Sequence, residues 1–188
     1  MTRFRFVPAR STVHIEGSSS LHPIQTTANG VEGYVDLEFG PGGEVTSEAS
    51  PVGTLTFPLD KLSSGNAMED RELYRRAEIR KFPTIKGVLD QVGPPAGDGT
   101  FAVGGDVTFK GVTRHYEHLL GITAVDDTTV ALSGASRFDI RDFGMQPPRV
   151  MMLKVDPEVD VSIDIVAERE AVEREAVERE AVEREAEE

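Results

Sequence analysis

Alternation of apolar and polar side chains in the second half of the chain restricts the folds open to it. Two alternating stretches meet at a Lys110-Gly111 corner, and the first has its apolar residues on odd positions, at Phe101, Val103, Val107 and Phe109. A β-strand sends successive side chains to opposite faces, so this pattern predicts strands of a sheet with one dry face and one wet face. The stretch 159–165 alternates in the same way.

Turn signals divide residues 1–166 into about ten short segments, most of them with strand character. The Asn29-Gly30 dipeptide predicts a two-residue hairpin between the segments on either side of it. Residues 66–79 do not alternate and are rich in helix-forming residues, so they predict one helix. An antiparallel sheet with one inserted helix is typical of a barrel or sandwich. We therefore predict an all-β, mainly antiparallel fold.

A length of 188 residues suits one domain with a substantial core. We assign this domain to residues 1–167, because residues 168–188 consist of EREAV repeats. Pairs such as Glu170 and Arg174 favour a charged, solvated helical tail, whereas the period of 3.5 residues that a coiled coil requires is missing.

Composition excludes several classes of function. The net charge of −13 has no basic patch to offset it, so we expect no nucleic-acid partner. Cysteine is absent, which excludes disulfides, thiol nucleophiles and thiolate metal sites. No apolar stretch approaches membrane-spanning length, and the first residues, MTRFRFVPARS, lack the apolar core of a secretory signal. We expect a cytoplasmic protein without stable membrane insertion.

Several motifs, taken in order, resemble the YceI-like family of polyisoprenoid-binding domains over residues 4–166. They are Ser63-Ser64-Gly65-Asn66 with Asp70 and Leu73, Phe82-Pro83-Thr84-Ile85, GDVTFKGVTR at 105–114, RDFGM at 141–145 and VSIDI at 161–165. The resemblance implies an extended, eight-stranded, lipocalin-like β-barrel. It also implies an apolar cavity for a polyprenyl lipid, an isoprenoid quinone or a similar amphiphile. Gly87 stands where the family often has an aromatic residue.

The residues themselves leave two interpretations of the barrel interior. A barrel of eight strands can be filled by its own side chains or can hold one small ligand. Aromatic residues are only 6% of the chain, Trp is absent, and glycines such as Gly87, Gly105 and Gly134 interrupt the expected strands, which favours a cavity. The same glycines could instead mark bends in a solid barrel. A solid-core barrel would act as a protein-interaction or stress-associated module, with the tail contacting a partner.

Alternation selects the side chains that would line a cavity. The predicted lining residues are Leu37, Leu55, Phe57, Leu89, Val107, Phe109, Leu132, Phe138, Val161 and Ile163. Tyr116, Arg137 and Arg141 are candidates for the cavity mouth or for contact with a ligand headgroup. Arg141 could alternatively pair with a carboxylate and fasten the last long strand.

We find no catalytic or metal-binding arrangement in the sequence. His115 and His118 are three residues apart in an expected strand, so they face opposite sides and are poorly placed to share a metal ion. No G-x-S-x-G motif is present. We therefore predict a protein that is not an enzyme, has no metal and has no cofactor apart from a bound lipid. Its partner would be a lipid-like small molecule, and the protein would be a monomer or homodimer.

Overall fold

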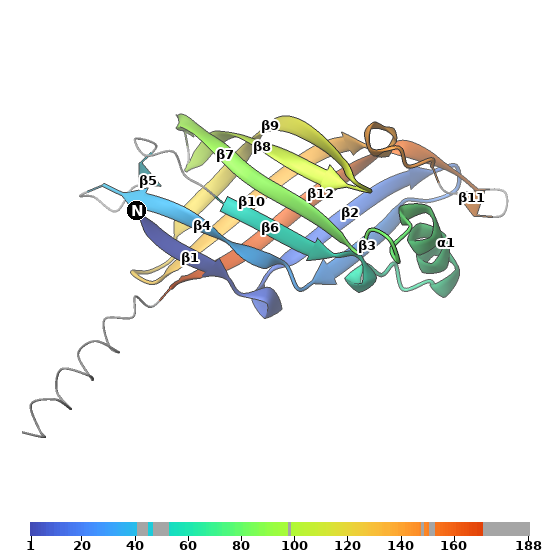
Figure 1. Ribbon diagram of the computed structural model, residues 1–188, viewed down its shortest axis with the longest axis horizontal. Helices are drawn as coiled ribbons and strands as arrows, with labels where there is room; N and C mark the ends of the chain where they lie inside the picture. Colours follow the sequence, from blue (N-terminus) through green and yellow to red (C-terminus); the bar gives the residue numbers. More distant parts are fainter. Residues whose placement is uncertain (41–44, 47–52, 98, 148, 151–152, 171–188) are drawn as a thin grey trace, which may run out of the picture.

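Eight strand positions close into an antiparallel barrel in the computed structural model (Figure 1). The structure describes residues 1–40, 45–46, 53–97, 99–147, 149–150 and 153–170. The order around the ring is β1-β4-β6-β7-β8-β9-β10-β12, and β12 pairs with β1 to close it. The bounds are β1 Thr2–Phe6, β4 Glu32–Phe39, β6 Gly53–Pro58, β7 Thr84–Gly97, β8 Thr100–Phe109, β9 Val112–Ala124, β10 Thr129–Asp139 and β12 Leu153–Arg169. The predicted all-β barrel is confirmed.

At two of the eight positions in the ring, the position is filled by two strands that follow one another in the chain. β2 (Thr12–Ser19) continues β1 and pairs with β12, while β3 (Ile24–Asn29) precedes β4 and pairs with β2. Residues 2–19 and 24–39 therefore form one long, interrupted hairpin whose turn lies at residues 20–23.

The predicted hairpin at Asn29-Gly30 is wrong, because the chain bends there without reversing. Gly30 has a φ of 98°, and its N–H donates to the carbonyl of Pro8, 3.1 Å away. Pro8–Arg10 form a short 3-10 helix that interrupts the partner strand at the same level. The chain is thus interrupted between β3 and β4 at the level where its partner is interrupted between β1 and β2. The positive φ of Gly30 allows this bend, and it does not mark a turn between two paired strands.

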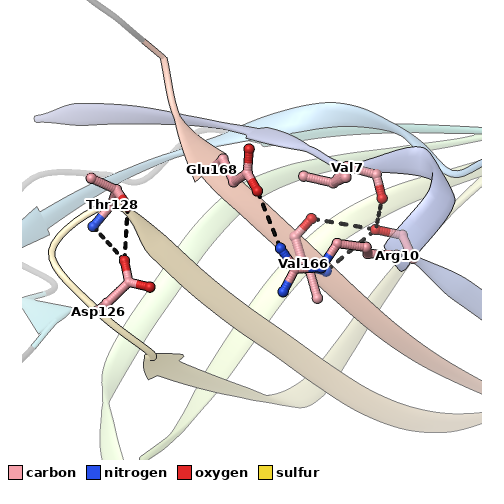
Figure 2. Close-up of polar contacts among 7 residues, drawn as sticks. Val7, Arg10, Asp126, Thr128, Val166 and Glu168 are labelled. Carbon is pink, nitrogen blue, oxygen red and sulfur yellow. Dashed lines mark hydrogen bonds and ion pairs between the residues drawn. The ribbon is translucent and has the colours of Figure 1, made fainter.

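The first and last strands of the described chain pair at the β1–β12 closure, part of which Figure 2 shows. The fully buried Ser11 hydroxyl donates to the carbonyl of Val7 at 2.8 Å and accepts from the Val166 N–H at 3.3 Å. Nearby, Arg10 pairs with Glu168 at 3.1 Å (Figure 2). β12 extends to Arg169, so the barrel includes the first two residues of the predicted tail. The predicted helix beyond residue 170 lies outside the described residues.

The predicted helix and the predicted Lys110-Gly111 turn are both confirmed. Lys110 and Gly111 have φ values of 49° and 75°, as a tight turn between two hydrogen-bonded strands requires. Helix α1 spans Ala67–Ala77, and the Asn66 side chain accepts a hydrogen bond from the Met68 N–H at its start. α1 lies at one end of the barrel, beside β3 and the short strand β11 (Arg149–Val150), whereas β5 (Val45–Thr46) lies at the opposite end (Figure 1).

The end of the barrel opposite α1 is packed solid with side chains. Seven ring strands each contribute one buried apolar residue to this layer, which we call the floor: Phe4, Leu37, Val92, Phe101, Ile122, Val130 and Ala167. Phe39 packs edge-on against Phe4, with ring centroids 5.7 Å apart. Among the described residues, no helix has the length and hydropathy needed to cross a membrane.

Candidate functional site

The half of the barrel between the floor and α1 contains a cavity of about 410 Å³. This volume is within the range of small-molecule sites. Inward-facing residues of the ring strands, together with β2 and β3, form its walls, and Leu73 of α1 lies at its end. Because these walls are mainly apolar, the cavity suits an apolar occupant.

On several ring strands the lining stops one inward position short of the floor. Phe6 and Val35 line the cavity, whereas Phe4 and Leu37, two residues further along their strands, belong to the floor. The cavity is therefore closed at this end. The two sequence-based interpretations each describe one half of the molecule, since the barrel is hollow near α1 and solid at the floor.

Nine of the ten predicted lining residues face the cavity in the structure. They are Leu55, Phe57, Leu89, Val107, Phe109, Leu132, Phe138, Val161 and Ile163. Leu37 lies instead in the floor, where it is fully buried. It shares the inward face of β4 with Val35, and alternation cannot tell which end of that face is solid. Contact of the nine residues with a ligand stays a prediction.

The glycines of the cavity wall have two different roles. A Cβ atom at Gly87 would lie 3.6 Å from the Leu55 Cβ, in ordinary contact, so a larger residue fits here without a clash at its Cβ. At Gly105 a Cβ would lie 2.4 Å from the Val88 carbonyl oxygen, so only glycine fits. The β7–β8 register shifts between Leu89 and Gln91 beside it. Gly105 thus permits the close approach of two strands at a bulge.

Helix α1 is fastened at its start by hydrogen bonds to one carboxylate. Asp70 accepts from the Ser64 N–H at 2.7 Å and from the Ser63 and Ser64 hydroxyls at 2.8 Å. Burial alone would raise the pKa of Asp70, but these three hydrogen bonds together lower it. The carboxylate therefore stays charged at neutral pH and holds α1 against the loop before it.

The end of α1 is fastened by the β8–β9 turn. The Lys110 ammonium donates to the Arg76 carbonyl at 2.9 Å and to the Glu78 carboxylate at 2.5 Å. Gly111 lies against the Phe82 ring just after the helix. The lysine of the tight turn thus holds the helix that lies at the end of the cavity.

One wall of the cavity carries polar groups among aromatic rings. Tyr116 and His118, two apart on β9, both line the cavity and stack with ring centroids 5.6 Å apart. The Phe138 ring meets both edge-on, at 4.9 Å and 5.4 Å. Burial raises the pKa of Tyr116, with a further contribution from Asp142, and burial lowers the pKa of His118.

Comparison with known proteins assigns this architecture to a family. Residues 4–167 match the sequence profile of the YceI-like domain. The chain belongs to the YceI-like family. No curated protein matches it.

Solved structures with the same barrel come from several bacteria. BcnA from Burkholderia cenocepacia is 16% identical with a TM-score of 0.70, over 86% of this chain and 98% of that chain. A polyisoprenoid binding domain from Saccharophagus degradans, implicated in plant cell wall breakdown, is 11% identical with a TM-score of 0.70, over 90% and 100%. The Campylobacter jejuni YCEI protein is 13% identical with a TM-score of 0.60, over 78% and 85%. These identities show a shared fold.

Of the three residues expected at the mouth of this YceI-like barrel, only Tyr116 lines the cavity. Arg137 pairs with Asp160 of the neighbouring strand at 2.8 Å, and Arg141 pairs with Asp139 at 2.5 Å. All four side chains lie outside the cavity lining. The structure therefore favours the fastening role that the sequence allowed for Arg141, and gives Arg137 a similar one.

The histidines of β9 in the YceI-like barrel face opposite sides, as predicted, because His118 lines the cavity while His115 is exposed. His115 lies 3.0 Å from Asp106, and their ligand atoms lie within 4.8 Å of an oxygen of Asp90. Sequence reasoning missed this cluster, because the β7 bulge that brings Asp90 to the other two is a tertiary feature. A hydrogen bond between His115 and Asp106 accounts for their proximity.

Proposed function

We propose that this chain binds or carries a long-chain isoprenoid, such as a polyprenyl lipid or an isoprenoid quinone, or a similar amphiphile, without catalysing a reaction on it. The observation that carries the proposal is an apolar cavity, closed at one end, inside a barrel whose other half is packed solid. Among the described lining residues, the His118 Nε2 has no hydrogen-bond partner, and the Ser64 hydroxyl donates to the Asp70 carboxylate that fastens α1. The Saccharophagus degradans neighbour, itself a polyisoprenoid binding domain, supports the same ligand class.

Burial of apolar surface would provide most of the binding free energy. Each buried CH₂ group contributes about 0.8 kcal/mol, so a few isoprene units give substantial affinity without a polar contact. A cavity closed at the floor admits a chain end-on, and the α1 end is then the side where the rest of the ligand emerges. The proposal requires no metal and no cofactor beyond the bound lipid, and it holds for a monomer or homodimer.

Native mass spectrometry of the full chain tests the proposal in two steps. Protein purified from cells should carry an added mass that an organic extract identifies as a lipid. After delipidation, the protein should take up geranylgeraniol. A chain that carries no lipid and, after delipidation, takes up no geranylgeraniol would refute the proposal.

A pair of neighbouring substitutions on β8 locates the site. Val107→Asp places a carboxylate inside the cavity, whereas Thr108→Asp places it on the outer face, where Thr108 contacts Thr113. An unpaired charge is costly to bury beside an apolar chain, so Val107→Asp should weaken geranylgeraniol uptake at least tenfold, by roughly 1.4 kcal/mol or more. Thr108→Asp should leave uptake unchanged. Equal effects in two folded variants, checked by circular dichroism, would place the ligand elsewhere.

A further inference from the structure

Two neighbouring strands of the barrel separate beside the cavity. β9 and β10 are paired only near the floor, through residues 120–124 and 130–134. Beyond these residues β9 stays paired with β8, and β10 with β12. The side chains of Tyr116, His118 and Phe138 lie at this separation and line the cavity, and we call them the aromatic wedge. Part of the wall is therefore built from side chains rather than from a hydrogen-bonded sheet.

The aromatic wedge contains two polar atoms without partners. The Tyr116 Oη and the His118 Nε2 are both shielded from solvent, and neither has a hydrogen-bond partner among the described residues. Most buried polar atoms in proteins are hydrogen-bonded, because an unpaired one is costly. Two such atoms at neighbouring inward positions of one strand point to a partner that a ligand would supply.

Charge around the aromatic wedge disfavours an anion. Burial raises the pKa of Tyr116 and lowers that of His118, so both side chains are neutral at pH 7. The negative charges of Asp142 and Asp139 near Tyr116 oppose the positive charge of Arg114, which lies outside the described lining. Lys86 is the one basic residue among the described lining residues, and it occupies an outward position between Ile85 and Gly87. A phosphate at the aromatic wedge would therefore have no cationic partner among the inward-facing residues of the described lining.

We propose that the aromatic wedge binds the uncharged oxygen, hydroxyl or carbonyl, of an isoprenoid ligand, and selects it over a plain hydrocarbon and over a phosphorylated isoprenoid. The inference rests on the proposed function and names the chemical class of its ligand. The Tyr116 hydroxyl donates to the ligand oxygen. His118 Nε2 completes the contact, donating to a carbonyl or accepting from a hydroxyl according to its tautomer. Because both atoms are covered in the barrel, this contact requires the two rings to shift when the ligand binds.

A competition experiment on the delipidated full chain tests this selectivity. Native mass spectrometry compares the bound fractions of geranylgeraniol, the hydrocarbon with hydrogen in place of its hydroxyl, and geranylgeranyl monophosphate. The wild-type chain should prefer the alcohol to both others. Tyr116→Phe and His118→Phe keep aromatic rings in the wedge but remove one hydrogen bond each, so each should weaken alcohol binding about three- to tenfold. Binding of the hydrocarbon should change less than twofold.

Tyr74→Phe is the matched control. The Tyr74 hydroxyl donates to the Leu62 carbonyl at 2.5 Å, and Tyr74 lies outside the described cavity lining. This variant should keep the wild-type ratio of alcohol to hydrocarbon.

The possible outcomes separate this inference from the function on which it rests. Retained hydrocarbon uptake shows that a wedge variant is folded. If both wedge variants keep the wild-type ratio of alcohol to hydrocarbon, the wedge is not the oxygen site, although the proposed function stands. If the wild-type chain binds the monophosphate as well as the alcohol, selection for an uncharged group is wrong. If it takes up none of the three probes, the proposed function itself fails.

Discussion

Replacement of Gly87 by phenylalanine would test the hollow half of the barrel directly. Gly87 lies on β7 opposite Leu55, and both residues line the cavity. A Cβ atom at Gly87 fits at ordinary contact distance, 3.6 Å from the Leu55 Cβ, and the backbone there is not left-handed. The new ring would therefore enter the cavity without moving the strand.

The expected stabilisation follows from the space available. Burying a phenylalanine side chain contributes about 1.5–3 kcal/mol, and replacing a glycine within a strand adds about 0.5–1 kcal/mol. Ordering the new side chain costs about 1 kcal/mol. The sum is roughly 2 kcal/mol, which raises Tm by about 4–8 °C in a domain of this size. In a barrel packed solid at Gly87, the same ring would overpack the core and cost about 1–3 kcal/mol.

Thermal unfolding of delipidated protein, followed by circular dichroism, gives the sign of this change. Native mass spectrometry with geranylgeraniol then measures uptake, which should fall at least tenfold because the ring occupies ligand space. Thr108→Phe adds the same ring on the outer face of β8, where Thr108 contacts Thr113 outside the cavity lining, and should leave uptake unchanged. A lower Tm together with unchanged uptake in Gly87→Phe would refute the cavity.

Three further predictions concern the attachment of helix α1 and the charged residues near the cavity. Lys110→Met removes the hydrogen bonds that fasten the end of α1. Hydrogen–deuterium exchange of the α1 amides should therefore become about tenfold faster, while exchange in β10 stays the same. Unchanged protection of α1 would contradict this. The pKa of Asp70 is lower in the folded state than its unfolded value near 3.9, so its stabilising contribution is present above about pH 4 and is lost as the pH falls through the folded pKa. Asp70→Asn should therefore flatten the decline of Tm below pH 4, and a decline as steep as that of wild type would argue against the role of Asp70. Arg137→Ala breaks an exposed ion pair that lies outside the cavity lining, so geranylgeraniol uptake should stay within twofold, whereas a tenfold loss would return Arg137 to the ligand site.

Local patterns were sufficient for most of the architecture. Alternation at Phe101–Phe109 and at 159–165 predicted strands whose inward faces are those of the structure. The helix and the Lys110-Gly111 turn were also recognisable, because helix propensity and turn chemistry act over a few residues. The same local logic failed at Asn29-Gly30, where the dipeptide bends a strand opposite an interruption in its partner. That partner interruption lies about twenty residues earlier, beyond the range of a turn signal.

The sequence by itself determined that this chain forms antiparallel strands with one apolar face, because side-chain direction along a strand follows directly from residue order. Only the tertiary structure decided where the barrel interior is empty. Leu37 and Val35 share one face of β4, yet one is packed in the floor and the other borders the cavity. The separation of β9 from β10, beside which the Tyr116 Oη and the His118 Nε2 have no hydrogen-bond partner among the described residues, is likewise invisible in the alternation of either strand. Whether a side chain meets a neighbour or a void depends on strands that face it across the barrel, and those strands are far away in sequence.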